Sequence, residues 1–123
     1  AILWDYKKAA PYVPSPLLYD NRLYFLSGMD GLITTLDAET GRPRFECKRL
    51  RAIRGIYSSP VGANDRVYVA GRDGATVVLK HSRNFQILAI NRLEDKFDAS
   101  PAIVGKDLFL RSHRFLYCIA EPD

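Results

Sequence analysis

Three stretches of the chain are almost continuously apolar, with aliphatic and aromatic residues at successive positions. They are residues 23–26, 67–70 and 108–110. Short runs of this composition are typical of strands, and an unbroken apolar run indicates that both faces of the strand are covered. No window combines apolar residues at helical spacing with capping residues. The apolar pattern therefore predicts an all-β fold.

The apolar stretches belong to a repeat. Each follows a Ser-Pro pair, and these pairs, at 15–16, 59–60 and 100–101, stand 44 and 41 residues apart. A turn follows each stretch, at 28–31, 71–74 and 112–115; the first two read Gly-x-Asp-Gly and the third has lost both glycines. In the first repeat a strand at 32–36 and a second turn at 37–41 come next, and we expect Gly41 to adopt a positive φ there. Each full repeat is thus predicted to form four short antiparallel strands.

A four-stranded antiparallel unit that recurs every ~40–45 residues is typical of a β-propeller blade. The sequence predicts the last strand of a preceding blade at residues 1–8, full blades at 15–50 and 56–94, and the first three strands of a final blade at 99–120. This amounts to about three blades, whereas closed rings have roughly 4–8. We therefore expect either part of a longer propeller or a ring completed by association of copies of the chain.

The repeat resembles that of the pyrroloquinoline-quinone (PQQ)-type propeller family. The resemblance is carried by the segment at 36–41, which reads Leu-Asp-Ala-Glu-Thr-Gly, together with the preceding Ser-Pro pair, the Leu23-Tyr24 strand and the Gly-x-Asp-Gly turn. Phe45 stands where the family has a tryptophan, and only Trp4 keeps it. The resemblance implies a propeller fold and a periplasmic or secreted location, but the family contains both dehydrogenases and non-enzymatic proteins, so it does not assign a function.

Within that family, the quinoprotein dehydrogenases carry a tryptophan that stacks on the cofactor, a disulfide between adjacent cysteines, and a calcium site built from Glu, Asn and Asp. This sequence has no Cys-Cys pair, and Trp4 occupies the structural position of the repeat. We therefore expect no quinone cofactor and no metal. Cys47 and Cys118 are predicted to be buried thiols, with a disulfide as the alternative.

Composition changes this picture little. The 123 residues are 47% hydrophobic with a net charge of +4, which is globular in character. No apolar run is long enough to span a bilayer, and the N-terminal residues show no basic-then-apolar signal segment.

We expect Asp30, Asp37 and Asp73 to serve as turn residues rather than as acid–base catalysts. His81 and His113 are expected to be solvated loop residues, and no serine lies in a nucleophile elbow.

One basic segment is the candidate site. Lys48, Arg49, Arg51 and Arg54 lie within seven residues on the connection between the two full repeats. Guanidinium groups suit anionic oxygens, so this segment is either an anion or partner contact or a solvated connection. It lacks interleaved aromatic residues, and we expect no nucleic-acid binding. A smaller basic group is formed by residues 111, 113 and 114.

These observations favour a non-catalytic propeller that serves as a binding or assembly scaffold for a protein partner or for further copies of itself. Two alternatives stay open. The chain could be a portion of a PQQ- and calcium-dependent dehydrogenase, or an anion-binding module that works through its basic connection.

Overall fold

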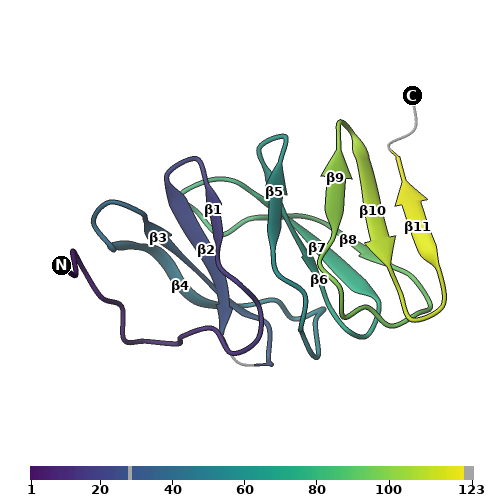
Figure 1. The fold of residues 1–123 in the computed structure, drawn as a ribbon, viewed down its shortest axis with the longest axis horizontal. Coiled ribbons are helices and arrows are strands. Elements are labelled where there is room, and N and C mark those ends of the chain that lie inside the picture. The colour runs from purple at the N-terminus through teal and green to yellow at the C-terminus, as the bar shows by residue number, and fades with distance from the viewer. Residues whose placement is uncertain (28, 121–123) are drawn as a thin grey trace.

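The computed structural model describes residues 1–27 and 29–120, so the predicted turn glycine Gly28 lies outside the described residues. This part of the chain forms eleven strands and no helix, which confirms the all-β prediction (Figure 1). The first sheet consists of β1 (Leu17–Tyr19), β2 (Arg22–Ser27), β3 (Leu32–Asp37) and β4 (Pro43–Arg49). The second consists of β5 (Val61–Ala63), β6 (Arg66–Ala70), β7 (Ala75–Lys80) and β8 (Ile87–Arg92). The third has β9 (Ala102–Val104), β10 (Asp107–Arg111) and β11 (Leu116–Ile119).

Each sheet is an antiparallel meander in which strands neighbouring in sequence also pair in space. The turns that join them explain this order. Gly31 has a φ of 68° in the turn after β2, and Gly74 has a φ of 98° in the turn after β6. Gly41, after β3, has a φ of 71°, as expected. Asp37 receives hydrogen bonds at Oδ1 from the backbone N–H groups of Glu39 and Thr40, which confirms its role as a turn residue.

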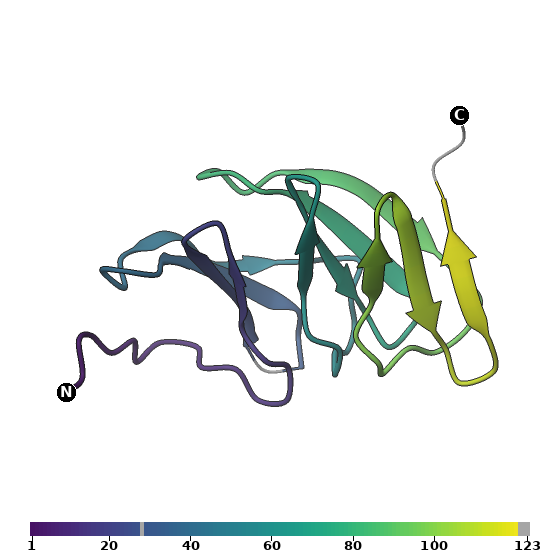
Figure 2. The ribbon, with the colours of Figure 1, turned by 45° about the horizontal axis from the view of Figure 1, so that its top comes forward.

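The three sheets stand in a row along the long axis of the molecule (Figures 1 and 2). Their first strands line up, since β1 contacts β5 and β5 contacts β9. Tyr19 of β1 lies so close over Gly62 of β5 that an added Cβ would be 1.7 Å from the tyrosine ring. This close approach of the innermost strands and the spread of the outer ones give the radial arrangement of propeller blades.

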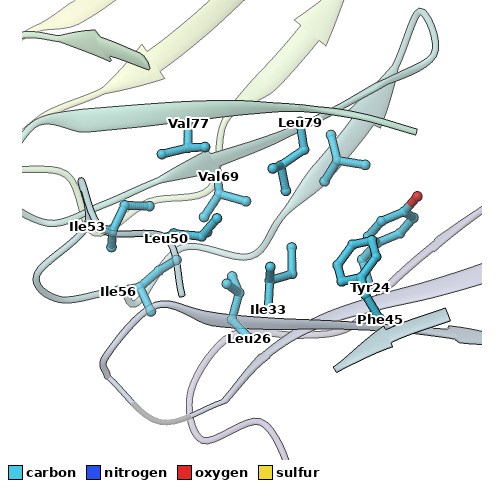
Figure 3. Packing of buried hydrophobic residues seen from close by; sticks show 11 residues of the cluster. Tyr24, Leu26, Ile33, Phe45, Leu50, Ile53, Ile56, Val69, Val77 and Leu79 are labelled. Atoms are coloured by element: carbon cyan, nitrogen blue, oxygen red, sulfur yellow. The ribbon is translucent and has the colours of Figure 1, made fainter. Parts of the chain in front are cut away.

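Two apolar cores hold the sheets together. The first and larger core lies between the first two sheets (Figure 3) and includes Tyr24, Leu26, Ile33, Phe45, Leu50, Ile53, Ile56, Val67, Val69, Val77 and Leu79. The second joins the second and third sheets through Ala70, Phe97, Leu108 and Leu110. Each fully buried large side chain contributes about 1.5–3 kcal/mol. No single sheet buries both of its faces by itself, so the sheets depend on one another for stability.

Residues 1–8 do not form the strand that the sequence predicted. They run as an irregular segment against the first sheet, where the Trp4 indole N–H donates to Ala38 O at 3.2 Å. The Tyr6 hydroxyl donates a hydrogen bond to Glu46 Oε2 at 2.5 Å. The Tyr6 ring packs edge-on against Phe25, with 5.6 Å between the ring centroids. The strand prediction is wrong for this segment, because its aromatic side chains are used for contacts with the first sheet instead of strand pairing.

The expectation of buried cysteines is also wrong. Cys47 and Cys118 are both free thiols and both exposed. Cys47 lies where the β3–β4 register shifts, with a φ of 50°, and its N–H donates to Thr34 Oγ1 at 2.9 Å. Cys118 lies on β11, at the end of the row, where no further sheet covers it within the described residues.

Candidate functional site

The connections between blades gather at one end of the strands. The turns after β2, β6 and β10 and the links after β4 and β8 share this end, which is the lower edge in Figure 1, and we call them the loop rim. Backbone hydrogen bonds tie them together: Leu50 N–H donates to Gly31 O at 2.8 Å, and Arg72 N–H donates to Gly55 O at 2.8 Å. The rim is therefore a fixed surface built from neighbouring blades.

The predicted basic segment lies on this rim. Arg49, Arg51 and Arg54 line a pocket of about 380 Å³ together with Ile53 and Asp30, which we call the arginine pocket. Arg49 Nη1 donates to the backbone oxygen of Asp30 at 3.5 Å. The structure thus brings three of the four candidate residues together. The fourth, Lys48, is exposed on β4, pairs with Ile33 and does not line the pocket.

Apolar anchors fix the course of this link. Leu50 is fully buried and Ile53 is 4% exposed, and the N–H of Ile53 donates to Leu50 O at 2.9 Å. Arg51 and Arg54 alternate with these anchors and are exposed. Because the anchors are held in the core, the guanidinium groups are confined to the rim rather than carried on a free loop.

The charge in the arginine pocket is not neutralised. Among the residues that the structure describes, Arg49, Arg51 and Arg54 form no ion pair, and Asp30 supplies the one carboxylate in the lining. The three guanidinium groups repel one another because they carry the same charge. An anion bound between them would relieve this repulsion and would be attracted by all three.

The next link forms a second pocket with a different charge balance. It measures about 580 Å³ and is lined by Asp73, Glu94, Asp95, Lys96, His113 and Arg114. Arg114 pairs with Asp95 at 3.3 Å. Beside the pocket, Asp98 pairs with Arg72 at 2.5 Å and with His113 at 2.8 Å.

These pairs lower the pKa values of the carboxyl groups that take part in them. The hydrogen bond from Arg72, followed by that from His113, holds the pKa of Asp98 below its ordinary value of 3.8. Hydrogen bonds, first from Ser112, also lower the pKa of Asp95. Two members of the basic group noted in the sequence, His113 and Arg114, are therefore paired with carboxylates that lie far from them in the sequence, whereas Arg111 forms no ion pair among the described residues.

His81 is not a solvated loop residue as expected. It is 9% exposed, and its Nδ1 lies 2.6 Å from the hydroxyl of Tyr24. Its Nε2 lies 3.2 Å from Asp20. The ring therefore joins the second blade to the first as a structural contact. His113 is exposed, as expected, but it is paired with Asp98.

The residues present do not fit a quinone and calcium site. In the described part of the chain no three His, Cys, Asp or Glu side chains are grouped to hold a metal ion. The one tryptophan, Trp4, lies against Gly41 at the N-terminal end of the row. Cys47 and Cys118 are unpaired and lie in different sheets.

No helix in residues 1–27 and 29–120 could cross a membrane.

The described residues form two four-stranded meanders and one three-stranded meander, which stand in a radial row. This arrangement defines a portion of a β-propeller. Comparison with known proteins gives the type of propeller. Neither a protein-family model nor a curated protein matches the sequence. Among solved structures, BamB from Moraxella catarrhalis superposes with a TM-score of 0.66 and 19% identity, covering 85% of this chain and 32% of that one.

Two dehydrogenases superpose in the same way. A europium-containing methanol dehydrogenase gives a TM-score of 0.60 at 19% identity, over 75% of this chain and 19% of the other. The quinohemoprotein alcohol dehydrogenase ADHIIG from Pseudomonas putida HK5 gives a TM-score of 0.60 at 15% identity, and the superposition covers 85% of this chain and 18% of the other. The chain thus spans about a third or less of these proteins, and the likeness shows its fold: a partial β-propeller, similar to part of the propellers of BamB and the quinoprotein dehydrogenases.

Proposed function

We propose that the chain is a non-catalytic propeller scaffold that binds a protein partner through its loop rim. The observation that carries the proposal is the arginine pocket, because it is a preformed hollow on a fixed surface whose charge is unmatched among the described residues. Loops held by a rigid β scaffold are common binding surfaces. In line with the family resemblance, we place this scaffold in the periplasm or outside the cell.

A photo-crosslinking experiment tests the rim as the binding surface. Benzoylphenylalanine replaces Met29, an exposed residue on the rim, or Arg83, an exposed residue at the opposite end of the strands. The two proteins are irradiated in an extract of the native source. We expect a discrete crosslinked protein from position 29 only. Equal crosslinking from both positions, or none from position 29, would contradict the proposal.

The dehydrogenase alternative has its own test. The protein is titrated with PQQ in the presence of calcium while the absorbance of bound cofactor is followed. We expect no saturable binding, since neither Trp4 nor the cysteines form a suitable site. Tight binding at one quinone per chain would overturn the non-catalytic assignment.

We also propose that a second copy covers the open end of the row. β11 has no outer strand beside it in the described residues, whereas β3 and β7 are each paired with one. In the sequence, residues 1–8 align with the fourth strand of the repeat, and they lie at the opposite end of the row from β11 (Figure 1), so in our proposal residues 1–8 of another copy supply a strand beside β11. Sedimentation equilibrium should show a defined dimer or larger closed species; a monomer at all concentrations would contradict this.

A further inference from the structure

Two successive rim pockets occupy equivalent places in the repeat but differ in charge. Leu50 N–H donates to Gly31 O, and Leu93 N–H donates to Gly74 O in the same manner 43 residues later. Two cations of the second pocket form ion pairs with carboxylates of the same chain, whereas Arg49, Arg51 and Arg54 form none among the described residues and share their pocket with the single carboxylate of Asp30. The difference lies in the side chains and not in the backbone, which indicates that the arginine pocket is built to receive negative charge from outside.

We propose that the arginine pocket binds an acidic peptide segment, with carboxylates of the segment paired to the guanidinium groups of Arg49, Arg51 and Arg54. This inference rests on the proposed scaffold function and gives the chemistry of the partner. A guanidinium presents two parallel N–H groups that match both oxygens of one carboxylate. Three such groups around one pocket can hold two or three carboxylates of a segment at once.

The lining favours a peptide over phosphate or nucleic acid. Asp30 contributes a carboxylate to the pocket, which would repel the dense charge of a polyphosphate but can pair with a peptide N–H or a basic side chain. Among the described residues, none that lines the pocket is aromatic, so the pocket offers no ring for stacking on bases.

The test uses fluorescence anisotropy with a fluorescein-labelled hexaglutamate peptide, and with hexaglutamine as the uncharged probe. One variant removes the pocket charges by the substitutions Arg49→Gln, Arg51→Gln and Arg54→Gln. A matched control removes three exposed cations at the opposite end of the strands by Arg42→Gln, Arg83→Gln and Lys106→Gln. Both variants lower the net charge from +4 to +1, and all substituted positions are exposed, so both should keep the far-UV circular dichroism of the parent.

We expect hexaglutamate, but not hexaglutamine, to bind the parent and the control variant with similar affinity. The pocket variant should bind at least about tenfold more weakly, which corresponds to the loss of one charge-assisted contact. Equal weakening in both variants would overturn the inference, because it would show a response to net charge alone.

Displacement of the peptide by inorganic phosphate at the same molar concentration would also overturn it, in favour of a simple anion site. Failure of the inference can be told from failure of the scaffold function. If hexaglutamate does not bind but crosslinking from position 29 persists, the partner chemistry is wrong and the scaffold stands.

Discussion

Gly74 is the residue at which the dependence of one blade on the next can be tested most sharply. It closes the turn after β6 with a φ of 98°, and an added Cβ would lie 2.1 Å from the backbone oxygen of Leu93 and 2.9 Å from that of Asp95. These oxygens belong to the link that leads into the third blade. They are backbone atoms of a link that is tied down at this point, because Leu93 N–H donates to Gly74 O at 3.0 Å and Leu93 O accepts from Asp95 N–H at 2.9 Å, so moving them aside disturbs these hydrogen bonds.

The cost of Gly74→Ala follows from these contacts. A side chain in this backbone region costs about 1–2 kcal/mol, and the lost hydrogen bond costs about a further 1 kcal/mol. With the displacement of the link we expect a loss of about 3 kcal/mol, a large part of the roughly 5–15 kcal/mol by which domains are stable. Gly105→Ala is the matched control, since Gly105 has a φ of 59° but no atom within 4 Å of an added Cβ. It should cost only about 1 kcal/mol.

The assay is urea unfolding followed by far-UV circular dichroism, with the free energy of unfolding obtained for the parent and both variants. We expect a clearly larger loss of unfolding free energy for Gly74→Ala than for Gly105→Ala. Equal losses would show that the backbone strain common to both positions accounts for the whole effect, and that the contact with the next link contributes nothing.

Three further predictions follow from the core and the polar contacts. Ile56→Ala removes a fully buried side chain from the larger core and should lower the free energy of unfolding by about 2–5 kcal/mol in the same assay. Tyr24→Phe leaves the buried His81 nitrogen unpaired and should lower the free energy of unfolding by about 1–3 kcal/mol. An unchanged free energy of unfolding would show that this contact does not stabilise the fold. Because Arg72 lowers the pKa of Asp98 in the folded state, the carboxylate stabilises the fold above its ordinary pKa of 3.8, and this contribution is lost as the pH falls through the lower folded value. The free energy of unfolding of Asp98→Asn should therefore fall less steeply below pH 4 than that of the parent.

The sequence predicted the features that depend on local spacing. The Gly-x-Asp-Gly turns and the apolar runs after each Ser-Pro pair are local, so they located the hairpins and the inner strands. Arg51 and Arg54 share one short link, so their proximity could also be expected. The place of Asp30 in the same pocket could not, because it depends on the tertiary hydrogen bond between Leu50 and Gly31.

Features that depend on pairing between distant segments were missed. Asp98 meets Arg72 across 26 residues and belongs to the next blade link, which no local pattern reveals. Cys47 follows the buried Phe45 by two residues and would share its face in a regular strand, but the register shift and a φ of 50° turn it outward. In this fold, turns are encoded locally, whereas charge matching and exposure at the blade edges depend on how the blades meet.

NMR of the arginine side-chain Nε–H resonances during titration with hexaglutamate shows directly whether the unpaired arginines of the rim form the binding site. We expect saturable shifts for Arg49, Arg51 and Arg54, with Arg42 and Arg83 at the opposite end of the strands unchanged. Shifts of similar size at all five arginines, or none in the pocket, would contradict this expectation.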